Sequence, residues 1–186
     1  MTIMKNIFKI SFALAAVLGL ASCDMNKRPY SVIDPENALE SPADAAKLSN
    51  GLHTQVRSLA VGSVNYYPEI QADIFHATTN YGNRGGQIYR WAFDATDSDF
   101  SSIWLSCYSS IANANYFLEK AASVQERVST DADFAANWAD KDLSLLKGQI
   151  SEAYFVRAYA YSILLDRFCP AYTEENENKE DLGLAI

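Results

Sequence analysis

The segment spanning residues 80–94 combines aromatic side chains with amides and a guanidinium. Flat aromatic faces can stack on the C–H surface of a sugar ring, and a few polar groups among aromatics are the usual composition of a small-molecule site. Because binding residues concentrate in loops held by a rigid scaffold, we predict that this loop contacts a ligand. The candidates, with Trp91 and Tyr89 first, are Trp91, Tyr89, Tyr81, Asn80, Asn83 and Arg90. Burial of the aromatics to pin a long loop is the alternative that the sequence leaves open.

Catalytic and metal-binding chemistry has little support. The sequence has two histidines, His53 and His76, and it lacks the GxSxG, HExxH and phosphate-binding glycine patterns. Asp73 and His76 stand at helical spacing, which we interpret as a surface pair on a helix. We therefore expect no catalytic residue, no metal site and no enzyme activity.

Three aspartates at 94, 97 and 99 superficially resemble a calcium loop. They lack the glycine and the distal bidentate glutamate of an EF-hand. Ser98 and Asp99 are better interpreted as the cap of the helix that follows.

The N-terminus has the three regions of a secretory signal. Lys5 and Lys9 form a positive region, residues 10–20 are almost entirely apolar, and Ala21 and Ser22 precede Cys23. The apolar stretch is too short to span a bilayer core, which takes about 20 residues. We therefore predict a signal peptide over residues 1–22.

A cysteine directly after the small residues resembles the lipobox of bacterial lipoproteins. The prediction is a covalent diacylglycerol and acyl lipid on Cys23 as the sole prosthetic group, and a lipidated tether over residues 23–40. Each buried methylene contributes about 0.8 kcal/mol to membrane binding, so two or three acyl chains would anchor the protein stably.

The charge balance excludes one class of partner. Removing the signal takes away Lys5 and Lys9 and no acidic residue, so the formal net charge falls from −8 to −10. Nucleic acids and anionic lipid surfaces need a positive footprint, which this chain lacks. For the two remaining cysteines, Cys107 and Cys169, the sequence leaves open both a disulfide and two free thiols.

Hydrophobic periodicity predicts an all-α fold of stacked antiparallel helices with no strand. We expect helices over residues 41–59, 66–78, 100–124 and 141–168, a short one within 129–140, and a long irregular loop over 80–98. Aromatic and apolar residues recur along one face of each of the two longest helices. These stripes are Trp104, Tyr108, Ile111, Asn115 and Leu118, and Tyr154, Ala158, Tyr161, Leu165 and Phe168.

Two of these helices resemble a known family. Residues 148–161 are similar to the G-x-x-x-E-A-x-F-x-R-A-x-x-Y helix of the SusD/RagB outer-membrane nutrient-binding lipoproteins, and residues 104–118 are similar to their W-x3-Y-x2-I-x2-A-N-x2-L helix. The lipobox, the tether and the L-G-L-A-I ending fall in the family's order, so the resemblance covers essentially the whole chain. Cys169 stands where the family commonly has glycine.

The resemblance implies a tetratricopeptide-like, SusD-like helical domain over residues 41–186. The chain is shorter than family members, so we expect a truncated, N-terminal portion of that domain. It also makes Glu152 and Arg157 structural residues that bind neighbouring helices.

The function that the resemblance implies is surface binding of glycans, or of peptides in some members. The bound nutrient would be delivered to a SusC-like TonB-dependent transporter in the outer membrane. The alternative is a helical-repeat lipoprotein that scaffolds other proteins and binds no ligand of its own.

Overall fold

The computed structural model describes residues 37–94, 96–171, 173 and 184. The chain divides into two compact units, Met1–Ala38 and Leu39–Ile186, and every helix considered below belongs to the second. The predicted signal peptide and Cys23 lie outside the described residues. The described residues form helices and turns without a β-strand, which confirms the all-α fold class.

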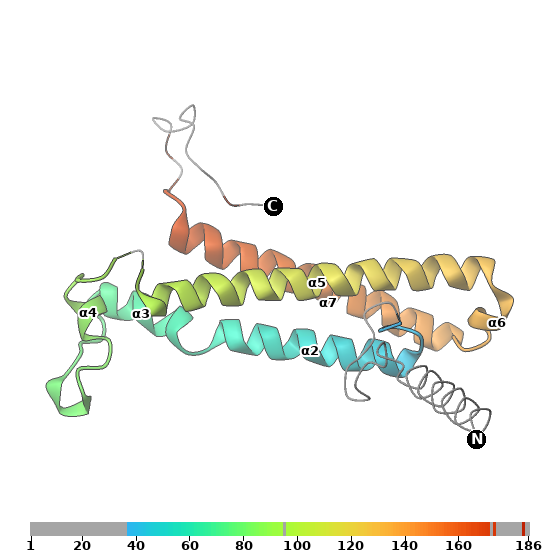
Figure 1. The fold of residues 1–186 in the computed structure, drawn as a ribbon, viewed down its shortest axis with the longest axis horizontal. Helices are drawn as coiled ribbons and strands as arrows, with labels where there is room; N and C mark the ends of the chain where they lie inside the picture. Colours follow the sequence, from blue (N-terminus) through green and yellow to red (C-terminus); the bar gives the residue numbers. More distant parts are fainter. Residues whose placement is uncertain (1–36, 95, 172, 174–183, 185–186) are drawn as a thin grey trace, which may run out of the picture. The chain divides into compact units, whose positions relative to one another are not determined.

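Three long helices pack side by side in the second unit (Figure 1). They are α2 (Pro42–Ala60), α5 (Ser98–Thr130) and α7 (Asp140–Phe168), and each contacts the other two. The short helix α6 (Ala132–Ala135) joins α5 to α7, which run antiparallel, and α2 also runs antiparallel to α5 (Figure 1). This is the stacked helical arrangement that the periodicity predicted.

Side-chain caps explain where two of these helices begin. The Ser41 Oγ accepts the N–H of Asp44 at 3.3 Å, which caps α2 at the start of the helix predicted over residues 41–59. The Asp97 Oδ1 accepts the N–H of Asp99 at 2.9 Å, so the cap of α5 lies one residue before the predicted Ser98. Helix α5 is therefore longer than predicted at its N-terminus, and it also continues to Thr130.

Helix α7 ends at Phe168, two residues before Pro170, as predicted. The backbone of Cys169 is extended, with φ of −111°. The position therefore requires no left-handed conformation, and a cysteine fits there without backbone strain. Both Cys107 and Cys169 are free thiols in this structure, and Cys107 is fully buried.

The predicted aromatic stripes lie beside the most buried faces of α5 and α7. Trp104 is 37% exposed, and Tyr154 and Leu165 are more than half exposed. The core-facing positions lie about one residue earlier and include fully buried alanines, whose small side chains let the helices approach closely. The buried residues are Ile103, Cys107, Ser110, Ile111, Ala114, Phe117, Ala121 and Val124 on α5, and Leu146, Ala153, Val156, Ala160, Ile163 and Leu164 on α7, and of these Ile111 belongs to a predicted stripe.

Polar links also tie the three helices together. The Oε2 of Glu152 on α7 accepts the Oγ–H of buried Ser49 on α2 at 2.9 Å, and His53 Nε2 lies 3.1 Å from the same oxygen. Arg157 on α7 donates to the Oδ1 of Asn115 on α5 at 3.0 Å. The predicted structural roles of Glu152 and Arg157 are therefore confirmed.

Helix α3 (Ser63–Gln71) is shorter than the predicted helix over 66–78 and begins earlier. Asp73 adopts φ of 61°, and the N–H groups of Asp73 and Ile74 bond back to the carbonyls of Ile70 and Glu69. This Schellman ending stops the helix. His76 lies beyond it, so the predicted helical pairing of His76 with Asp73 is wrong.

The loop predicted over residues 80–98 contains two short helical turns, the 3₁₀ turn η1 (Thr79–Tyr81) and helix α4 (Gly86–Tyr89). Ile88 of α4 is buried with residues of α3, which fixes the segment on the bundle. Gly85 precedes α4 with φ of 74°, and an added Cβ there would lie 3.0 Å from the Cδ1 of Ile70. Across the described residues, none of the helices is long and apolar enough to cross a membrane.

Candidate ligand-binding site

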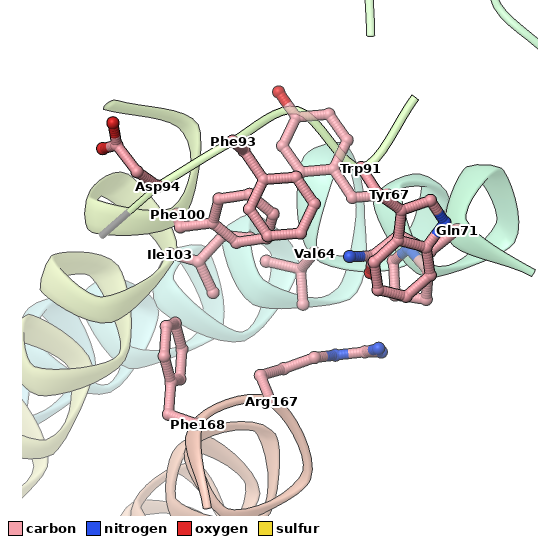
Figure 2. A pocket seen from close by; sticks show the side chains of 11 residues that line it. Val64, Tyr67, Gln71, Trp91, Phe93, Asp94, Phe100, Ile103, Arg167 and Phe168 are labelled. Atoms are coloured by element: carbon pink, nitrogen blue, oxygen red, sulfur yellow. The ribbon is translucent and has the colours of Figure 1, made fainter. Parts of the chain in front are cut away.

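An apolar cavity of about 500 Å³ lies where α3, the segment after α4, the start of α5 and the end of α7 meet (Figure 2). This volume falls within the range of roughly 300–1,000 Å³ that small-molecule sites occupy. Its lining residues are Val64, Tyr67, Pro68 and Gln71 from α3, Trp91, Phe93 and Asp94 from the segment after α4, Phe100 and Ile103 from α5, and Arg167 and Phe168 from α7.

Four aromatic rings form a continuous series along this cavity. The ring centroids of Trp91 and Phe93 are 6.0 Å apart, those of Phe93 and Phe100 are 4.6 Å apart, and those of Phe100 and Tyr67 are 6.2 Å apart. These separations are typical of interacting aromatic pairs. The series gives an extended apolar surface on which the flat face of a sugar ring can stack.

Trp91 has an unusual backbone for so large a side chain. Its φ is 55°, in the left-handed region that favours glycine. The N–H of Trp91 bonds to the Ile88 carbonyl at 3.1 Å, and the N–H of Ala92 bonds to the Gln87 carbonyl at 2.8 Å. These are the two hydrogen bonds of a Schellman motif, with tryptophan at the position usually held by glycine. Strained residues of this kind concentrate at functional sites.

The indole of Trp91 is also exposed. The residue retains 64% of its accessible surface, although it lies at the wall of the cavity (Figure 2). Little core packing is therefore gained in return for the strained backbone. An exposed aromatic face at a cavity wall is suited to contact a ligand.

Tyr67 is buried and helps to fix the wall formed by α3. Burial, and then hydrogen bonding to the Asp99 carboxylate, raise the pKa of the Tyr67 hydroxyl well above its ordinary value. The hydroxyl therefore remains a donor to Asp99 and joins α3 to the first turn of α5.

A charged side chain lies toward each end of the cavity, and the two charges are opposite. Asp94 lies beside Phe93, and the Arg167 side chain extends from α7 toward the end where Trp91 and Gln71 lie (Figure 2). The Asp94 Oδ1 accepts the N–H of Thr96 at 2.7 Å. Hydrogen bonds from the Thr96 hydroxyl and N–H lower the pKa of Asp94, so this carboxylate is ionised at neutral pH.

Of the five predicted ligand-binding residues whose side chains the structure describes, one, Trp91, lines this cavity. Tyr89 is 38% exposed and its ring centroid lies 6.4 Å from that of His76, outside the cavity lining. Arg90 is the exposed C-cap of α4. Asn80 in η1 and Asn83 in the turn before α4 are likewise outside the lining, and the side chain of the predicted Tyr81 is not among the described parts of the structure.

The Asn83 position has a turn role of its own. Its φ is 56°, and its carbonyl accepts the N–H of Gly86 at 2.9 Å. The alternative reading, burial of the loop aromatics, does not hold for Trp91 and Tyr89, because both are exposed. The anchor of the segment is instead the aliphatic side chain of Ile88.

Several cavity residues were missed from sequence. Phe93 and Asp94 belong to the predicted loop and follow Trp91 directly, so the same composition could have indicated them. Tyr67 and Gln71 stand four residues apart on one helix face. Arg167 and Phe168 carry no local signal of a site, because they reach the cavity only through the packing of α7.

No metal-binding arrangement accompanies the cavity. Within the part of the chain that the structure describes, no group of three or more His, Cys, Asp or Glu side chains is placed to hold an ion. Two of the three aspartates, Asp94 and Asp97, accept hydrogen bonds from backbone N–H groups.

The fold and the cavity together define an all-helical protein with an aromatic-lined cavity of small-molecule size. Residues 25–184 match the family model of the SusD-like proteins, which is described as starch-binding and associating with the outer membrane. The chain belongs to this SusD-like family. No curated protein and no solved structure matches the chain.

Proposed function

We propose that this chain binds glycan at the aromatic cavity while a lipid on Cys23 holds it on the outer face of the outer membrane. The observation that carries the proposal is the series of rings from Trp91 to Tyr67, beginning with an exposed tryptophan in a strained backbone. Family membership supplies the ligand class and the membrane, because the family is described as starch-binding and associating with the outer membrane.

The proposed role of binding is uptake, in which the chain hands the glycan to a SusC-like TonB-dependent transporter. The cavity supports this role in one respect. It is partly open and its aromatic wall is exposed at Trp91, so an oligosaccharide can be held without being enclosed. A role of this kind requires binding and release, and it requires no bond to be made or broken.

Ligand binding is tested by electrophoresis of the full chain through gels that contain starch or other polysaccharides. We expect retardation that is lost on replacing both Trp91 and Phe93 by alanine. Phe155→Ala is the matched control, since Phe155 is a 59% exposed aromatic on α7 outside the cavity. Equal retardation of the double variant and the control would refute the site.

The anchor and the transporter are tested separately. Incorporation of labelled palmitate into the wild-type chain, and its loss in Cys23→Ser, would support the lipid. Co-purification with a TonB-dependent transporter would support delivery. Co-purification without a response to any glycan would favour the scaffold alternative instead.

A further inference from the structure

We propose that the cavity is selective for acidic sugars, with Arg167 binding the carboxylate of a uronic acid while the ring stacks on the aromatic series. This inference rests on the proposed glycan-binding function and specifies its ligand class. The juxtaposition that carries it is a single cationic side chain at one end of an aromatic cavity whose other end holds a carboxylate.

Arg167 has capacity for a ligand. Its Nε lies 3.4 Å from the Oδ2 of Asp166, its neighbour in sequence. Neither of its terminal nitrogens donates a hydrogen bond to a described residue. A guanidinium presents two parallel N–H groups that match the two oxygens of a carboxylate, and such charged pairs are stronger than neutral hydrogen bonds.

The surroundings of Arg167 favour an anionic ligand further. Its side chain is 31% exposed, and it reaches a cavity whose walls are mostly aromatic and aliphatic. An ion pair gains strength where water is partly excluded. A neutral sugar would remove water from the guanidinium and offer no opposite charge in its place. The lost hydration would then weaken binding.

Asp94 sets the direction in which such a sugar lies. Hydrogen bonds from Thr96 keep this carboxylate ionised, so it repels the acid group of a ligand and accepts hydrogen bonds from sugar hydroxyls. The uronate carboxylate is thereby directed to the end where Arg167, Trp91 and Gln71 lie (Figure 2).

The whole chain is acidic, with a formal net charge of −8, and it repels long polyanions. The suitable probe is therefore a short oligomer. A trisaccharide with a single terminal uronate and the methyl ester of that trisaccharide share one sugar backbone and differ in one carboxylate, so their comparison isolates the ion pair.

Isothermal titration calorimetry of the full chain with both oligomers tests the proposal. We expect the acidic trisaccharide to bind about tenfold more tightly than its methyl ester, equivalent to about 1.4 kcal/mol. Arg167→Gln should remove this difference, because glutamine carries no charge to pair with the carboxylate. Arg167→Lys should retain part of it, because the charge remains and the paired donors are lost.

Arg84→Gln is the matched control, since Arg84 is an exposed cation in the turn before α4 and lies outside the cavity. Equal affinity of the wild-type chain for the two oligomers would overturn the selectivity and leave glycan binding standing. An unchanged preference in Arg167→Gln that has retained its helical circular dichroism would also overturn it. Failure to bind any neutral or acidic glycan would overturn both this inference and the proposed function.

Discussion

Trp91 offers a test in which two variants should lose ligand binding alike and differ in stability. Its left-handed backbone is suited to glycine, whereas its exposed indole is suited to a ligand. Replacing Trp91 by glycine should relieve the backbone strain and abolish binding. Replacing it by alanine should abolish binding and keep the strain, so the two variants form a matched pair.

The expected magnitudes follow from the geometry. Trp91 is 64% exposed, so its loss uncovers about 70 Å² and costs at most about 2 kcal/mol in both variants. A side chain in the left-handed region costs roughly 1–2 kcal/mol, and the greater backbone entropy of unfolded glycine offsets about 0.5–1 kcal/mol of that relief. Trp91→Gly should therefore be more stable than Trp91→Ala by up to about 1.5 kcal/mol.

Thermal unfolding followed by circular dichroism measures this difference, which corresponds to up to about 6 °C in Tm for a chain of this size. Retardation on polysaccharide gels measures binding in parallel. A glycine variant that is less stable than the alanine variant would refute the strain. Retained binding in either variant would refute the role of the indole.

Three further changes test the scaffold that holds the cavity. Glu152→Ala leaves the buried Ser49 hydroxyl without its acceptor on α7 and should lower the free energy of unfolding by about 1–3 kcal/mol in urea titrations. A change within 0.3 kcal/mol would argue against this link. Gly85→Ala places a Cβ at positive φ, 3.0 Å from Ile70 Cδ1, and should cost about 1–2 kcal/mol and weaken glycan binding. Unchanged Tm and affinity would contradict it. Burial raises the pKa of Cys107 from 9.0 to about 11, so its contribution to stability should be present below pH 9 and be lost between pH 9 and 11. Mass spectrometry after iodoacetamide at pH 9 should find it modified in urea and protected in the native chain, and equal labelling would contradict its burial.

The helices were predictable because their signals are local. Ser41 before a proline marks the start of α2, and Pro170 marks the end of α7. The end of α3 was not predictable in this way. It depends on a left-handed Asp73, and aspartate is compatible with several backbone conformations.

The faces of the helices were predicted less well than their extents. Periodicity located the aromatic stripes through Trp104 and Tyr154, but most of the core is formed by the neighbouring stripes, which combine alanines with larger apolar residues. A three-helix contact selects the faces that allow close approach, and the most apolar stripe need not be among them. The same limit explains why Tyr89 was predicted for the site and Tyr67 was not.

The amino-acid sequence by itself indicated the helical fold class, the family and a ligand-binding role for Trp91, since these follow from spacing, capping and composition along single segments. Only the tertiary structure decided where the cavity lies and that Arg167 reaches it. The physical reason is that the cavity wall comes from four separate segments, and its shape depends on how α3, α5 and α7 pack. Burial and charge placement at such a junction are properties of that packing, and no single segment carries them.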